Sequence, residues 1–270
     1  MQDLQPTERS EPRANGHPTE PLDPDLYADP PARDARFRVV DRWCECVNLP
    51  PDHPLHTVEF THRQMNEEVN GLECSARCLG DFPEAPWELR IWFARQCADE
   101  ARHVHMFRRL LERLGGHVGQ FPVMNFQYRI ITRAETLVGR LTIQNRTFEA
   151  GGLDAVSWVV RQARDAGDGD MEEFFESQLA DEILHVRFAN EWVHRMIHAD
   201  PREMLQMSKA MTRAAEAFRQ VMGSEGTDGV YYPTDRPSRL EAGFAEEEVE
   251  LASEAARRVA QRGKRGDPVP

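Results

Sequence analysis

A seven-residue stretch, Ala-Asp-Glu-x-x-His-Val, occurs twice in this sequence and constrains the fold more than any other feature. The copies begin at Ala98 and Ala180. Each copy places a glutamate three residues before a histidine, and positions i and i+3 share one face of an α-helix. The pairs are Glu100 with His103 and Glu182 with His185. Two such helices that face each other would direct two carboxylates and two imidazoles into the same space.

Two further Glu-x-x-His pairs are not expected in that space. Glu191 and His194 follow the second repeat pair by nine residues, which is about half a turn out of phase at ~3.6 residues per turn. We therefore expect them on the surface. Glu59 and His62 lie 14 and 11 residues before Glu73, roughly 16 to 21 Å along a helix axis. That distance is too large for a site shared with Glu73.

A pair of metal ions needs more carboxylates than the repeat supplies. Glu73 and Glu149 both lie among apolar or small residues, where burying an unpaired carboxylate would be costly. They precede the repeat glutamates by 27 and 33 residues, which suits an antiparallel helical hairpin in each case. This order matches the set of a lone Glu and a Glu-x-x-His found in ferritin-like di-iron bundles. We therefore expect six metal ligands: Glu73, Glu100, His103, Glu149, Glu182 and His185.

The residue types suit this chemistry. Carboxylates are hard anionic donors, and imidazole is a borderline donor that suits iron. Asp99 and Asp181 each stand one residue before a repeat glutamate. We expect each to accept the N–H of a ligand histidine on a neighbouring helix. No catalytic base or nucleophile independent of the metal ligands is evident.

Glycine and proline positions predict an all-α bundle with short extensions. We expect helices at 56–80, 87–114, 127–150, 171–198, 202–222 and 244–262, and no strand. Gly151-Gly152 is expected to interrupt the third helix, with a helical segment that continues to about 165. The predicted divisions are a disordered or draped arm at 1–36, the bundle with the dinuclear site at 37–222, and a C-terminal extension at 223–270 that ends in a helix and a basic tail.

The composition of the chain limits its expected partners and cellular location. The net charge of −13 argues against a nucleic-acid partner, because phosphate backbones require clustered Lys and Arg. The five cysteines match no zinc framework and fit reduced thiols. No apolar run approaches about 18 residues, and the N-terminal residues include no apolar segment typical of a signal peptide. We therefore expect a cytoplasmic protein that does not contact membranes.

Several segments together resemble the ferritin-like proteins of the DUF455 family. They are Phe82-Pro83-Glu84-Ala85-Pro86, Asp99 to His103, Phe148 to Asp154, Asp181 to Val186, and Arg239 to Phe244 followed by Glu246-Glu247-Glu248. The similarity extends from about residue 56 to residue 255. It implies a ferritin-like four-helix bundle with extra C-terminal helices, an irregular N-terminal arm and a di-iron centre.

The sequence departs from that family around the predicted ligands. Arg77 stands where family members usually carry tryptophan, and Gly152 follows Gly151 where Arg-Gly is common. These changes favour a pocket for a polar or anionic substrate, with Arg77 binding a carboxylate or, alternatively, packing its stem and pairing with an acid. The expected pocket residues are Arg77, Asn70, Phe148, Met65 and Trp192. Residues of the last three types more often belong to an ordinary core than to a pocket.

The leading hypothesis is a non-haem di-iron oxygenase or oxidase that activates O2 and acts on a small organic molecule. The expected cofactor is two Fe ions, with Mn/Fe as an alternative that the same ligands would serve. An external electron donor, such as a ferredoxin or a flavin reductase, is expected, and a homodimer is left open. Two alternatives are a tRNA-modifying di-iron hydroxylase and an iron-handling, ferroxidase-type ferritin-like protein.

Overall fold

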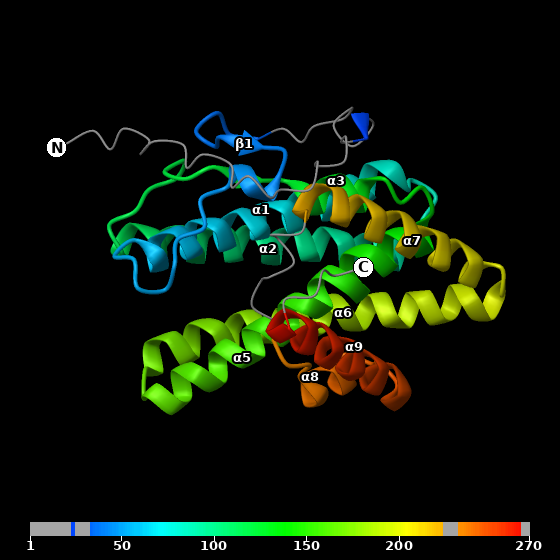
Figure 1. The fold of residues 1–270 in the computed structure, drawn as a ribbon. Coiled ribbons are helices and arrows are strands. Elements are labelled where there is room, and N and C mark those ends of the chain that lie inside the picture. The colour runs from blue at the N-terminus through cyan, green and yellow to red at the C-terminus, as the bar shows by residue number, and fades with distance from the viewer. Residues whose placement is uncertain (1–22, 25–32, 224–231, 266–270) are drawn as a thin grey trace.

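The computed structural model describes residues 23–24, 33–223 and 232–265, and confirms an all-α helical bundle (Figure 1). The helices are α1 (His56–Asp81), α2 (Trp87–Arg113), α3 (Phe126–Thr132), α4 (Leu137–Ile143), α5 (Ala150–Ala166), α6 (Gly169–Ala199), α7 (Glu203–Met222), α8 (Arg236–Glu241) and α9 (Glu246–Arg265). A π-helical segment, η3 (Gln144–Glu149), joins α4 to α5, and a short 3-10 turn, η2 (Trp43–Glu45), precedes α1. The strands β1 (Val39–Val40) and β2 (Val123–Met124) form a small sheet.

Two helical hairpins form the centre of the bundle. The α1–α2 pair makes one layer and α5 with α6 makes the other, while α8 and α9 lie beyond α6 on its outer side (Figure 1). One apolar cluster joins the hairpins through Met65, Phe107, Leu111, Val156 and Phe175. A second cluster joins α2, α4 and α6 through Leu89, Phe93, Leu141, Phe188 and Val193. Burying each such side chain stabilises the fold by about 1.5–3 kcal/mol, and the two clusters lie on either side of a polar middle section.

The helix predicted over 127–150 is interrupted earlier than expected, between α3 and α4. Thr136 caps α4, because its side-chain oxygen accepts a hydrogen bond from the Gly139 amide at 3.2 Å. The Arg140 guanidinium donates to the carbonyls of Thr132 at 3.2 Å and Ala134 at 3.4 Å. These carbonyls lie where the helix ends, so the buried arginine satisfies groups that the break would leave unpaired.

The interruption expected at Gly151-Gly152 is wrong, because α5 runs through both glycines. A glycine costs a helix only about 1 kcal/mol relative to alanine. Their neighbours Ala150 and Leu153 are fully buried, and this packing outweighs the low helix propensity.

A small parallel sheet, which the sequence did not predict, ties the segment before α1 to the loop after α2. Val39 pairs with Val123, and Val40 with Met124. Two-residue strands carry no alternating pattern that a sequence could reveal. Close by, Gly119 has φ of +84°, and a Cβ there would lie 2.2 Å from the Arg36 carbonyl oxygen. Only glycine fits this approach.

Most of the predicted N-terminal arm lies outside the described residues. Of the parts described, Asp23 pairs with Arg133 at 2.6 Å and Arg33 pairs with Glu73 at 2.6 Å, so both contact the bundle. At the other end, the basic stretch at 262–265 belongs to α9. Among the described helices, none has the length and apolar composition to cross a membrane.

Candidate metal centre

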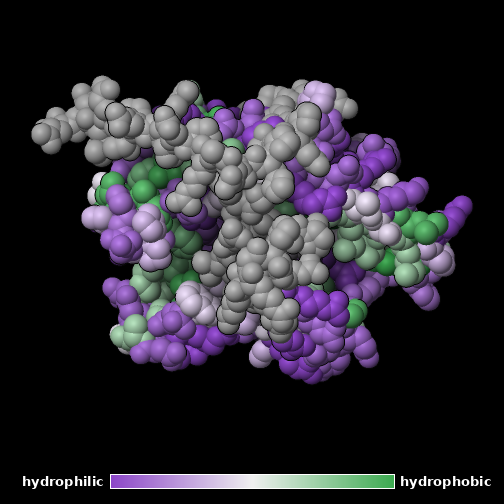
Figure 2. Space-filling model, in the orientation of Figure 1, coloured by the Kyte–Doolittle hydropathy of each residue, from purple (hydrophilic) through white to green (hydrophobic). Residues whose placement is uncertain are grey.

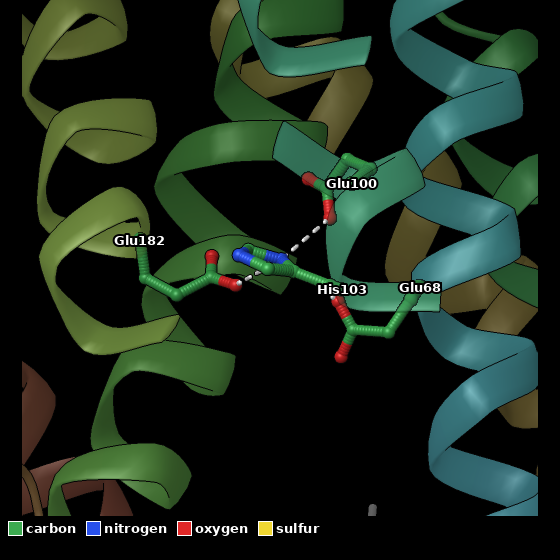
Figure 3. A group of neighbouring side chains, drawn as sticks. All are labelled: Glu68, Glu100, His103 and Glu182. Carbon is green, nitrogen blue, oxygen red and sulfur yellow. Dashed lines mark hydrogen bonds and ion pairs between the residues drawn. The ribbon is translucent and has the colours of Figure 1, made fainter. Parts of the chain in front are cut away.

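Four glutamates and two histidines converge in the polar middle of the two hairpins. Oxygen and nitrogen atoms of one group lie within 4.8 Å of one another, and those of a second group do likewise. The first group is Glu68, Glu100, His103 and Glu182, and the second is Glu100, Glu149 and His185. Figure 3 shows the first group, with Glu68 projecting from α1, Glu100 and His103 from α2, and Glu182 from α6 into one space. Both copies of the repeat therefore face the same point.

The two imidazoles occupy equivalent positions around two shared carboxylates. Nδ1 of His103 lies 3.3 Å from Glu100 and 3.7 Å from Glu182. Nδ1 of His185 lies 3.4 Å from Glu100 and 3.6 Å from Glu182. The remaining carboxylates approach one imidazole each, Glu68 at 3.2 Å from His103 and Glu149 at 3.8 Å from His185. The arrangement has approximate twofold order, with Glu100 and Glu182 in the middle.

The aspartates of the repeat orient the histidines across the bundle, as predicted. Nε2 of His103 lies 3.2 Å from Asp181 on α6, and Nε2 of His185 lies 3.3 Å from Asp99 on α2. A proton shared with aspartate on Nε2 leaves the Nδ1 lone pair directed at the carboxylates. Asp181 is itself held by Arg102.

Two glutamines complete the repeat, and the sequence reasoning missed them. Gln96 donates to Glu100 at 3.1 Å and to Glu149 at 3.0 Å. Gln178 donates to Glu68 at 2.9 Å and to Glu182 at 3.4 Å. Each glutamine stands four residues before a repeat glutamate, so the repeat is nine residues long, Gln-x-Ala-Asp-Glu-x-x-His-Val. Extending the comparison of the two copies by two residues would have found both.

The structure corrects one predicted ligand: Glu68, not Glu73, joins the group. Five residues rotate a helix by about 140°, so the two carboxylates leave α1 in different directions. Glu73 instead receives hydrogen bonds from Arg33 at 3.0 and 2.6 Å. That guanidinium also bonds Asn66 and Asn70. Glu73 is therefore neutralised by an arginine far away in the sequence.

Glu149 reaches the centre from an irregular backbone. It is the last residue of η3, where hydrogen bonds span one residue more than in an α-helix. Thr147 shows this widening, since its hydroxyl donates to the Thr142 carbonyl five residues earlier at 3.0 Å. Short π-helical turns occur frequently at functional sites, and nothing in the sequence marked this one.

The four carboxylates of the centre lie too close together to be ionised at the same time unless cations or protons neutralise them. Burial raises the pKa of Glu68 to about 8, and burial together with Glu100 and Glu182 raises that of Glu149 well above its usual range. Burial opposes charge on His103, but hydrogen bonds to Glu100 and Glu68 outweigh it and raise its pKa to about 10. Without metal, the cluster therefore retains protons that a metal ion would displace.

The unsatisfied atoms of the cluster fit a metal. Glu182 Oε2 and His185 Nδ1 are buried and have no hydrogen-bond partner among the described residues. Such buried atoms are costly unless they are coordinated. Four carboxylates and two imidazoles with fixed tautomers form a donor set that suits two divalent ions of the first transition row.

A cavity of about 400 Å³ opens onto the glutamates of this centre. Phe148, one of the predicted pocket residues, lies in its wall, and so do Gly151 and Gly152. A Cβ at either glycine would meet no atom within 4 Å, so the glycines leave this side of the cavity open. Glu67 also lines the cavity, and burial raises its pKa to about 7.

The other four predicted pocket residues lie elsewhere. Arg77 donates to Asp81 at 2.7 Å and to the Tyr128 hydroxyl at 3.0 Å, away from the cavity. Of the two roles predicted for Arg77, these contacts fit the second, in which its head pairs with an acid. Asn70 is buried beside Arg33, and Met65 belongs to an apolar cluster. Trp192 packs against a different cluster, with Arg195 over its ring.

The two additional Glu-x-x-His pairs also lie outside the centre. Glu191 and His194 are exposed on α6, as predicted from their helical phase. His62 is fully buried, where its Nε2 accepts a hydrogen bond from the Gly119 amide at 2.9 Å. Burial lowers the pKa of His62 to about 4, and Glu59 pairs with Arg63. His62 therefore supports the Gly119 turn.

Comparison with known proteins places the chain in a family. Residues 5–250 match the family described as "Protein of unknown function (DUF455)". An uncharacterized protein of Haemophilus influenzae is 25% identical over 203 residues, which cover 73% of this chain. The matched region spans 65% of that relative, just under two thirds of its length. No solved structure matches. Because the family match covers most of the sequence, this chain belongs to the DUF455 family.

Proposed function

We propose that this protein is a ferritin-like, di-iron-dependent oxidoreductase that uses O2 to oxidise a small organic molecule. The observation that carries the proposal is the position of Glu100 and Glu182, each of which approaches both imidazoles. Glu68 and His103 would hold one iron, Glu149 and His185 the other, and the two central glutamates would be shared. This is the ligand set of ferritin-like di-iron bundles.

Each part of the chain has a defined role in this proposal. The two ions, Fe/Fe or Mn/Fe, would supply a redox-active, Lewis-acidic pair at which O2 is reduced. Asp99 and Asp181 fix the histidine tautomers, and Gln96 and Gln178 hold the carboxylates in place. The apolar part of the cavity lining would surround the reacting molecule. Electrons would come from an external donor such as a ferredoxin or a flavin reductase, in the cytoplasm.

The test is anaerobic loading with Fe(II), followed by addition of O2. We expect two iron ions per chain by elemental analysis, a transient change in absorbance and O2 uptake that stops after the stored electrons are used. The absence of both O2 uptake and a change in absorbance would contradict the proposal. Continued oxidation of many Fe(II) equivalents by a 24-subunit shell would favour iron storage instead.

A further inference from the structure

The cavity beside the centre has a lining that restricts what it can bind. Its volume of about 400 Å³ suits a compact small molecule. The cluster glutamates form one side, and the walls are largely aromatic, including Phe107, Phe126, Phe148, Phe175, Phe218 and Tyr232. On the face drawn in Figure 2, hydrophobic side chains gather between the α1–α2 pair and α5. Most of a bound molecule must therefore be apolar.

The side chains of the lining would not attract an anion. Among the described residues, no lysine or arginine lines this cavity. The arginines closest in sequence to the α1 lining pair with other acids, Arg63 with Glu59 at 3.0 Å and Arg77 with Asp81. Arg63 is nevertheless near enough to offset part of the rise that burial causes in the pKa of Glu67. Apart from the metal ions proposed for the centre, a substrate carboxylate would thus meet other carboxylates and no cationic side chain of the lining. The structure removes the basis for the anionic substrate expected from the sequence.

Glu67 gives the cavity a carboxylate in addition to the four in the centre. Two divalent ions would offset the charge of those four but not that of Glu67. Glu67 accepts a long hydrogen bond from Asn70 at 3.4 Å, and no ion pair within 4 Å involves it in the described part of the chain. Burial raises its pKa by more than Arg63 and Arg33 lower it from a distance. Glu67 and Gly71 lie one turn apart on the same face of α1, about 6 Å along the axis. A Cβ at Gly71 would lie 3.0 Å from the Glu100 carboxyl carbon, so Glu67 stands about one turn from the centre.

We propose that the substrate is an apolar amine, whose protonated amino group pairs with Glu67 while its aromatic or alkyl body packs against the phenylalanine wall. The amide oxygens of Gln64 and Gln127, which also line the cavity, provide further acceptors for N–H groups. Aromatic rings favour a nearby ammonium group through their negative faces. That the amine is a substrate rests on the proposed oxidation; that the cavity binds it does not.

Binding can be tested without turnover. The full-length protein is loaded with Zn(II), which fills the metal positions but has no redox chemistry. The probes are 2-phenylethylamine, 2-phenylethanol and 3-phenylpropanoate, each measured by isothermal titration calorimetry. We expect the affinity for the amine to exceed that for the carboxylate by about tenfold or more. Glu67→Gln is expected to weaken amine binding about tenfold and to leave binding of the alcohol unchanged.

A matched control is Glu176→Gln, which alters a half-exposed glutamate on α6 paired with Arg164 and should change none of the three affinities. Equal or tighter binding of the carboxylate would overturn the proposal. A loss of amine binding in Glu67→Gln that is matched by the alcohol would also overturn it. If the amine preference holds but Fe(II)-loaded protein takes up no O2, the proposed oxidation fails and the binding site remains.

Discussion

In the α1–α2 half of the centre, Glu68 comes from an uninterrupted α-helix, whereas in the α5–α6 half Glu149 ends a π-helical turn. The side chains around them nevertheless correspond: a glutamine four residues before each repeat glutamate, and an aspartate on the opposite histidine. The two halves therefore agree in the positions of their donor atoms but not in backbone. The π-helical turn therefore places the Glu149 carboxylate where the regular helix α1 places that of Glu68.

The outer contacts of the two halves also differ. Gln96 accepts a hydrogen bond from Asn145 at 3.0 Å, so both ends of its amide are bonded. Gln178 has a buried oxygen with no partner among the described residues. The glutamine that serves Glu68 is thus held less completely than the one that serves Glu149. If the halves are functionally equivalent, matched substitutions must have matched effects.

The largest effect is expected from a shared carboxylate. Glu100→Gln removes an oxygen donor that approaches both imidazoles, so we expect both metal ions to be lost. Elemental analysis after gel filtration measures this directly. Retention of two ions per chain would show that Glu100 is not shared.

Removing a terminal carboxylate should affect one half only. We expect Glu68→Gln and Glu149→Gln each to retain about one ion per chain. The control is Glu73→Gln, which should retain two. Loss of the charged partner of nearly buried Arg33 should lower the free energy of unfolding of this control by about 3 kcal/mol. A loss of metal in Glu73→Gln that matches the loss in Glu68→Gln would reverse the assignment.

The metal-free protein should lose stability as pH rises. The folded pKa of Glu68 is about 8 against an ordinary 4.5, so the folded state holds a proton that the unfolded state has released. This contribution is complete below pH 4.5 and is lost as pH approaches 8. His103, raised from 6.5 to about 10, acts in the same direction at higher pH. Each group contributes a slope of up to about 1.4 kcal/mol per pH unit.

Urea denaturation of chelator-treated protein between roughly pH 5.5 and 7.5 measures this slope. Glu68→Gln should make it shallower. Metal-loaded protein should show the opposite trend, because the ions displace the protons. Stability of the metal-free protein that increases over this range would contradict the assigned direction.

The aspartates offer a direct comparison of the two halves. Asp181→Asn and Asp99→Asn each remove the carboxylate that orients one histidine. We expect each substitution to lower the affinity for one metal ion by about 10- to 100-fold, as measured by competition with a chelator. Strongly unequal losses would show that one half binds metal mainly through its carboxylates.

The smallest effect concerns the glycines around the centre. A Cβ at Gly71 would lie 3.0 Å from the Glu100 carboxyl carbon and 3.1 Å from Oε1. Gly71→Ala should therefore shift Glu100 and weaken metal binding by up to about tenfold. Gly151→Ala, where a Cβ meets no atom within 4 Å, should leave metal binding unchanged and stabilise α5 by about 0.5–1 kcal/mol. Equal metal affinities in the two variants would exclude a packing role for Gly71.

Much of the bundle and five of the six clustered residues could be predicted because helix lengths and the repeat are local features. The positions of Glu68 and Glu73 relative to the turn between α1 and α2 distinguish the ligand from the residue that was wrongly predicted. Glu68 lies 13 residues before the end of α1, and Glu100 lies 13 residues after the start of α2, so the two meet at the same height. Glu73 lies only eight residues from the end of α1. In a hairpin whose two helices run side by side from the turn, it is therefore not level with Glu100.

Other features could not be predicted because they depend on contacts between distant segments. The partner of Glu73 is Arg33, 40 residues away, in a stretch without helical periodicity. Arg77 donates a hydrogen bond to Tyr128, 51 residues away. The break before α4 depends on a buried guanidinium that binds two carbonyls. None of these pairings leaves a local pattern.

The π-helical segment has a consequence for chain length. A π turn is an α-helix that contains one extra residue. A chain one residue shorter between Gln144 and Glu149 would close this segment as regular α-helix. Ala150 and the residues that follow would keep the same register against α6, and so would Glu149, which is bonded directly to Ala150. A single deletion here would thus spare the flanking helices and change only the side chains that this segment presents to the centre.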